Sequence, residues 1–84
     1  MKSLQQKRPK VIVSNRALYA RIDRALRRDG EQLRTARSEA MESQAGRYYI
    51  VDTERNFIAH MDVDLEDLGR KLGVLQAWEE VGKE

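Results

Sequence analysis

The fold is constrained most by residues 16–30, a strongly basic stretch that carries apolar residues at helical spacing. Leu18, Ile22 and Leu26 recur every fourth residue, so a helix would place them on one face. The arginines of the same stretch fall on the opposite side of the helical wheel. We therefore predict an amphipathic helix over residues 15–28 that turns its apolar face toward the core.

The ends of this helix can also be predicted. Ser14 is a good N-cap, because its side-chain oxygen can accept from N–H groups of the first turn. Asp29-Gly30 is a good end, because glycine accepts the left-handed conformation that commonly terminates helices. The preceding residues 11–13, "VIV", either form a short strand or pack beside the helix.

Two later stretches, "RYYIVD" and "FIAHMDV", predict a β-hairpin over residues 47–63. Both are rich in aromatic and β-branched residues, and the "TERN" between them suits a short hairpin loop. The alternation of a strand puts Tyr48 and Tyr49 on opposite faces. One of the two therefore faces the helices, and the other is free to contact solvent or a ligand.

The segment before the hairpin is ambiguous. Residues 32–37 alternate apolar and charged side chains, which favours an edge strand. We expect an irregular or turned stretch from there to Gly46, although Ser38 to Gln44 could equally be helical.

The last third of the chain predicts one or two short helices. Asp64 is placed as an N-cap, and Asp67 puts an acidic side chain in the first turn, where the helix dipole favours it. Gly73 is placed to end this helix, and "VLQAWEEV" is interpreted as a further helical turn with Trp78 in the core. The order of elements predicts an α+β fold: an N-terminal amphipathic helix, an antiparallel sheet of two to three strands, and these C-terminal helices.

Length and composition bound what the chain can do. Its 84 residues are expected to make one domain at residues 11–84, after a disordered basic arm at residues 1–10. A core of this size leaves little room for a deep active site. Because there is no cysteine, we expect no disulfide framework and a cytoplasmic location. The apolar run at residues 11–13 is too short for a signal peptide or a membrane span.

Charge is divided unevenly along the chain. Residues 1–37 hold eleven Lys or Arg and three acidic residues, whereas residues 38–84 hold five basic and eleven acidic residues. Such an imbalance indicates either a polyanionic partner or complementary self-association.

The candidate site is the basic face of the first predicted helix. Arginine presents a rigid fork of donors that matches phosphate oxygens, and contacts to phosphates carry little sequence preference. The alternative is that this face is simply the solvated side of an amphipathic helix. We predict nucleic-acid binding through the helix arginines and the cations of the arm, which are Arg16, Arg21, Arg24, Arg27, Arg28, Lys7, Arg8 and Lys10.

The acidic second half supports a different hypothesis, a protein-interaction or homodimerisation module, since complementary potentials steer association. The acidic residues concerned are Asp62, Asp64, Glu66, Asp67, Glu79 and Glu80. Several of them are equally well explained as acidic residues at the start of a helix. The hypothesis therefore stays open beside nucleic-acid binding.

No residue pattern predicts catalysis or a bound metal. A calcium loop counted from Asp62 would need glycine sixth and glutamate twelfth, but Asp67 and Gly73 stand there. His60, the only histidine, lies in a predicted strand and could recruit only carboxylates to a metal. No serine lies in a motif that supplies the base a nucleophile needs. We therefore expect no enzymatic activity, no cofactor, no metal and no small-molecule substrate.

Three stretches between Leu18 and Glu79 carry a resemblance to a family. They are "RIDRALRRDGEQLRTAR", "GRYYIVDTERNFI" and "VDLEDLGRKLGVLQAWE", and the span covers about three quarters of the chain. Together they resemble short accessory proteins of plasmids, phages and integrated mobile elements of proteobacteria. The resemblance implies a small bacterial cytoplasmic protein and brings no catalytic or ligand residue with it.

Overall fold

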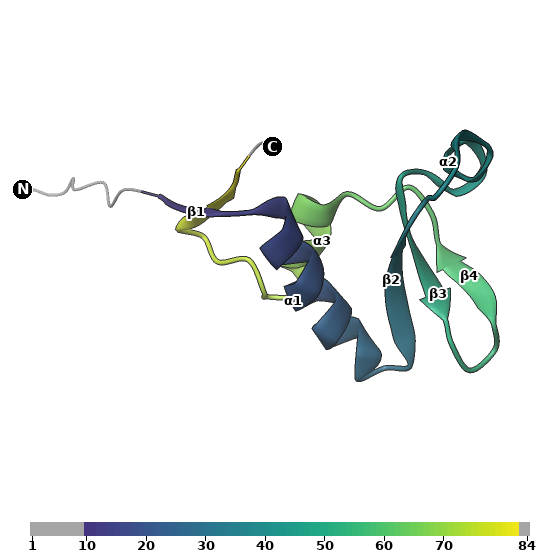
Figure 1. The fold of residues 1–84 in the computed structure, drawn as a ribbon. Helices are drawn as coiled ribbons and strands as arrows, with labels where there is room; N and C mark the ends of the chain where they lie inside the picture. Colours follow the sequence, from purple (N-terminus) through teal and green to yellow (C-terminus); the bar gives the residue numbers. More distant parts are fainter. Residues whose placement is uncertain (1–9, 83–84) are drawn as a thin grey trace, which may run out of the picture.

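The computed structural model describes residues 10–82, which form an α+β fold of three helices and five strands (Figure 1). The predicted fold class is thereby confirmed. Within residues 10–82 no helix is long and apolar enough to cross a bilayer. Residues 1–9 of the predicted arm lie outside the described residues. Along the chain the elements are β1 (Val11–Val13), α1 (Asn15–Arg27), β2 (Glu31–Thr35), α2 (Glu39–Ala45), β3 (Tyr48–Asp52), β4 (Phe57–His60), α3 (Leu65–Lys71) and β5 (Glu79–Val81).

Helix α1 forms where the apolar spacing predicts it, but it follows strand β1 and is not the first element of the fold. The Ser14 hydroxyl caps the helix by accepting, at 3.0 Å, from the backbone N–H three residues on. Leu18 and Ile22 are fully buried and Leu26 is 4% exposed, so the apolar face fills the centre of the core. Gly30, with φ of +75°, then turns the chain from α1 into β2.

Strands β2, β3 and β4 form an antiparallel sheet in that order, and β3 with β4 confirms the hairpin predicted over residues 47–63. Leu33 and Ile50 are opposite each other in β2 and β3 and belong to the same buried cluster as the apolar face of α1. Helix α1 also covers the outer edge of β2. The N–H of Leu33 donates to Asp23 Oδ1 at 3.0 Å, and its C=O accepts from the Tyr19 hydroxyl at 2.8 Å.

The segment after β2 differs from the prediction. We expect an irregular stretch up to Gly46, but Glu39–Ala45 form helix α2, so this prediction is wrong and the helical alternative for Ser38 to Gln44 is the one observed. The physical reason lies at Ser38, whose hydroxyl accepts from the N–H of Met41 at 3.1 Å and caps the helix. Gly46, with φ of +84°, ends the helix before β3 begins.

The C-terminal segment also differs from the prediction, because it forms strand β5 and not a helical turn. β5 pairs in parallel with β1, with Val11 opposite Glu79. Trp78 is 52% exposed, and Leu75, at 3%, occupies the core in its place. The pairing gives partners to backbone groups of β1 that a terminal helix would leave unpaired.

Helix α3 begins after the predicted N-cap, Asp64, whose carboxylate accepts from the N–H of Asp67 at 3.2 Å. The chain leaves this helix through Gly73, at φ of +76°. α3 packs on α1 through Gly69, where an added Cβ would lie only 2.8 Å from Cδ1 of Leu18. This close approach fixes α3 beside the basic helix.

Candidate nucleic-acid interface

The outer face of α1 carries the five helix arginines predicted as site residues, and the structure divides them by what they contact. Arg16, Arg24, Arg27 and Arg28 are exposed, whereas Arg21 is half-buried. Arg21 contacts Glu79 of β5, and Arg27 contacts Asp23 on the side of α1 that meets β2. The remaining three are Arg16, Arg24 and Arg28.

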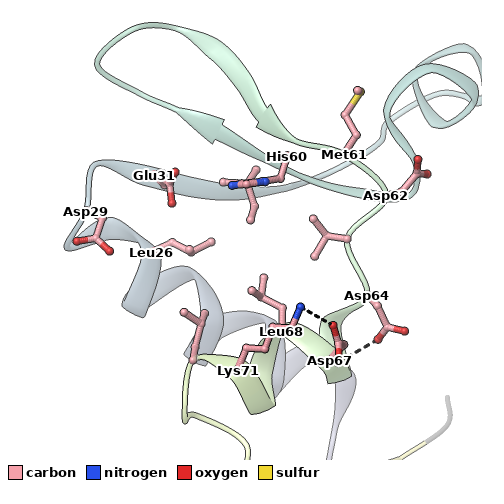
Figure 2. Close-up of a pocket in the computed structure, with 13 residues that line it drawn as sticks. Leu26, Asp29, Glu31, His60, Met61, Asp62, Asp64, Asp67, Leu68 and Lys71 are labelled. Carbon is pink, nitrogen blue, oxygen red and sulfur yellow. Dashed lines mark hydrogen bonds and ion pairs between the residues drawn. The ribbon is translucent and has the colours of Figure 1, made fainter.

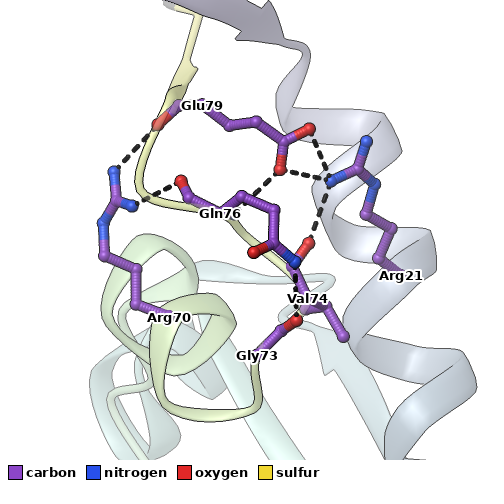
Figure 3. Close-up of polar contacts among 6 residues, drawn as sticks. All are labelled: Arg21, Arg70, Gly73, Val74, Gln76 and Glu79. Atoms are coloured by element: carbon purple, nitrogen blue, oxygen red, sulfur yellow. Dashed lines mark hydrogen bonds and ion pairs between the residues drawn. The ribbon is translucent and has the colours of Figure 1, made fainter.

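Arg21 is held against the segment that leads into β5 (Figure 3). Its Nη1 donates to both carboxylate oxygens of Glu79, at 2.9 and 3.1 Å, and to the C=O of Val74 at 2.9 Å. The Glu79 carboxylate also accepts from the N–H of Gln76 at 2.8 Å. On the other side of the same loop Arg70 donates to the C=O groups of Gln76 and Glu79. Arg21 therefore anchors β5 to α1.

This network lowers the pKa of the Glu79 carboxyl from its ordinary value. The hydrogen bond from Arg21 is the largest cause and the hydrogen bond from the Gln76 N–H the next, while the charges of Arg21 and Arg70 act in the same direction against the opposing effect of burial. Glu79 is therefore ionised at neutral pH, and its charge compensates that of Arg21.

Arg27 pairs with Asp23, one turn earlier in the helix. Arg27 Nε donates to Asp23 Oδ2 at 2.8 Å. The second oxygen of the same carboxylate accepts from the backbone N–H of Leu33. Asp23 thus links α1 to β2 and compensates the charge of Arg27, although the Arg27 side chain stays 59% exposed.

Arg16, Arg24 and Arg28 make up the rest of the face, and we call these three residues the arginine centre. Within residues 10–82 these three side chains make no hydrogen bond or ion pair, and all are exposed. At 1.5 Å per residue they are spread over about 18 Å of helix. Arg24 and Arg28 also line a shallow cleft together with Arg21 and Val74. Among the described residues, the arginine centre thus offers three guanidinium groups without a carboxylate partner, spread over about 120° of the helix surface.

Arg47, which is not among the residues predicted from the sequence, is brought beside this surface by the fold. Arg16 and Arg47 line one depression with Asn15 and Tyr48. The Arg47 guanidinium lies 5.7 Å from the centroid of the Tyr48 ring, and the Tyr48 hydroxyl accepts from the Asn15 amide at 3.1 Å. Tyr49, on the opposite face of the sheet, is buried. Arg47 meets Arg16 only because β3 starts beside the first turn of α1, so no local sequence signal indicates it.

Lys10 is the one residue of the predicted arm that the structure describes. It immediately precedes β1, and its Nζ donates to the C=O of Ala77 at 3.4 Å. Lys7 and Arg8, predicted to extend the basic surface, lie outside residues 10–82. The candidate interface therefore consists of α1 and Arg47.

A second hollow has the opposite charge (Figure 2). It lies between the C-terminal end of α1, the three-stranded sheet and α3, and we call it the acidic cleft. His60 also lines it, but within residues 10–82 no three side chains of His, Cys, Asp or Glu are grouped so that they could hold a metal ion. Its charged lining residues, the histidine aside, are Asp29, Glu31, Asp62, Asp64, Asp67 and Lys71.

No protein-family model, curated protein or solved structure matches this chain. Two surfaces of the molecule bear on its function, the arginine centre and the acidic cleft. The resemblance to accessory proteins of mobile elements stays a hypothesis.

Proposed function

We propose that the protein is a small, non-enzymatic module that binds the phosphate backbone of nucleic acid through the arginine centre. The observation that carries the proposal is that Arg16, Arg24 and Arg28 are exposed on one face of one helix and have no carboxylate partner among residues 10–82. On the strength of the sequence resemblance, we further propose that it acts in the bacterial cytoplasm as an accessory protein of a mobile element.

The contacts that hold α1 in place support this function. One margin of the helix is joined to β5 by Arg21 and Glu79, and the other is joined to β2 by Asp23 and the N–H of Leu33. The arginine centre therefore extends from a helix whose position is already fixed, which reduces the entropy lost when these side chains bind a ligand. Guanidinium groups match phosphate oxygens in a bidentate geometry.

The same geometry predicts how the binding behaves. Contacts to phosphates position a protein without reading bases, so we expect little sequence preference. Each contact releases condensed counterions, so affinity falls steeply with added salt. The acidic cleft does not serve this function, because its carboxylates repel phosphate.

The test is to measure binding of the purified protein to a short DNA duplex and to a single-stranded RNA at two salt concentrations. We expect salt-sensitive binding that Arg24→Glu/Arg28→Glu abolishes. Arg37→Glu/Arg55→Glu is the matched control, because it reverses two exposed arginines outside α1 and changes the net charge equally. Absence of binding at low salt, or an equal loss in both double variants, would contradict the proposal.

A further inference from the structure

The acidic cleft is the hollow that nucleic-acid binding leaves without a role. Helix α1 packs against β2, and α3 packs against α1. The cleft lies where β4 and α3 face each other (Figure 2). His60 is opposite Ile50 in the sheet, so both side chains extend to the same face and line this hollow.

The floor of the cleft is apolar. Leu26 and Ile50 reach it from the core, with 4% and 3% exposure, and Leu68 reaches it from α3. Leu72, which also lines the cleft, is 39% exposed. Covering this side chain would remove apolar area from water, so the cleft favours a partner with an apolar surface.

Carboxylates surround this floor. Asp29 and Glu31 come from the turn after α1 and the start of β2, and Asp62 comes from the connection between β4 and α3. Among residues 10–82, Lys71 is the one lysine or arginine of the lining, and it is already paired with Asp67 at 3.3 Å. The cleft is therefore strongly negative, although the whole chain carries a net charge of +2. A complementary ligand must supply cations at the rim and apolar groups at the centre.

We infer that the acidic cleft docks a cationic amphipathic helix of a partner protein. Such a helix carries an apolar stripe flanked by Lys and Arg, which matches an apolar floor flanked by carboxylates. Long cationic side chains can lay their methylene stems on the floor while their charged ends reach the rim. The chain's own cationic helix, α1, is not available to a second copy, because its apolar face is buried in its own core.

The experiment uses the full chain and a fluorescently labelled leucine–lysine peptide whose leucines follow the helical period. The comparison peptide has the same composition in scrambled order, and binding is measured by fluorescence anisotropy without nucleic acid. We expect the helical peptide to bind about tenfold or more tightly than the scrambled one. Backbone amide chemical shifts should change at Leu26, Met61 and Leu72.

Two variants test the two halves of the site, each with a matched control. Asp62→Asn/Glu31→Gln should weaken the helical peptide severalfold, whereas Glu39→Gln/Glu42→Gln, which removes two exposed carboxylates on α2, should not. Leu72→Ser should weaken binding, and Ile58→Ser, at a similarly exposed position outside the cleft, should leave it unchanged. Thermal unfolding of every variant verifies that the fold is intact.

Three results would overturn the inference. Equal affinity for the helical and scrambled peptides, or an equal loss of affinity in the α2 control, would mean that net charge alone attracts the peptide. Shift changes outside the cleft would place the peptide elsewhere. Self-association of the protein that Asp62→Asn/Glu31→Gln abolishes would assign the cleft to a second copy. Arg24→Glu/Arg28→Glu should retain peptide binding, so this test is independent of nucleic-acid binding.

Discussion

Asp23→Asn should increase the positive charge that α1 offers to a ligand while changing the stability of the fold only slightly. The Asp23 carboxylate has two partners, Arg27 Nε on Oδ2 and the N–H of Leu33 on Oδ1. Asparagine keeps one carbonyl oxygen, which can accept from Leu33, and replaces the other oxygen with an amide that cannot pair with Arg27. The variant therefore releases a fourth arginine on the same face and leaves the link to β2 in place.

The expected effect on binding follows from counterion release. Three phosphate contacts by the arginine centre predict a slope of log Kobs against log salt of about −2.7 on duplex DNA, and release of Arg27 steepens it to about −3.6. One further contact at that slope corresponds to roughly eightfold tighter binding near 0.1 M salt. Loss of the ion pair between Asp23 and Arg27 costs about 0.3–0.5 kcal/mol, so the unfolding midpoint should fall by only about 1–4 °C.

Fluorescence anisotropy of a labelled duplex over a series of salt concentrations measures both the affinity and the slope. Asp67→Asn is the matched control, because it breaks the same kind of i,i+4 ion pair and releases Lys71 on α3 with an equal change in net charge. If both variants gain affinity equally, net charge and not the arginine face attracts the duplex. If Asp23→Asn keeps the fold but changes neither slope nor affinity, phosphate does not contact α1 at Arg27.

Two predictions concern stability. The pKa of Glu79 is lowered in the folded state, so its ionised form contributes stability above the unfolded-state pKa. This contribution disappears as pH falls through the folded-state pKa. Chemical denaturation from neutral to acidic pH should therefore show that the free energy of unfolding falls more steeply for the native chain than for Glu79→Gln. Gly69→Ala should lower the unfolding midpoint, because the 2.8 Å approach of the new Cβ to the fully buried Leu18 costs about 1–3 kcal/mol, more than the roughly 1 kcal/mol that alanine contributes to a helix. A stabilised Gly69→Ala chain in thermal unfolding would show that α3 does not rest on α1 as closely as the structure has it.

The sequence predicts the elements whose causes are local. The four-residue spacing of Leu18, Ile22 and Leu26, capped by Ser14, predicts α1 to within one residue of its observed end, Arg27. The β-branched and aromatic run with a short polar loop predicts the β3–β4 hairpin. These features depend on hydrogen bonds and side chains a few residues apart, which the sequence displays directly.

Candidate sites depend on contacts between residues far apart in the sequence, more than helices and strands do. The sequence identifies the basic face of α1, but it does not say which of the five arginines already have a carboxylate partner. Arg21 is compensated by Glu79, from the far end of the chain, and Arg47 reaches Arg16 only through the placement of β3. The acidic cleft likewise combines carboxylates from several elements, and the sequence analysis could list some of them without knowing their common apolar floor.

The sequence by itself thus determined the α+β class, the position of α1, the hairpin, and the concentration of positive charge on one helix face, because each follows from residue periodicity and nearby caps. Only the tertiary structure decided that residues 79–81 form a strand beside β1, and that Trp78 lies at the surface. It also decided that three of the five arginines on α1 have no carboxylate partner in the part of the chain that the structure describes. The physical reason is that strand pairing and ion pairing between distant residues depend on which backbone edges and charges the packed core brings together.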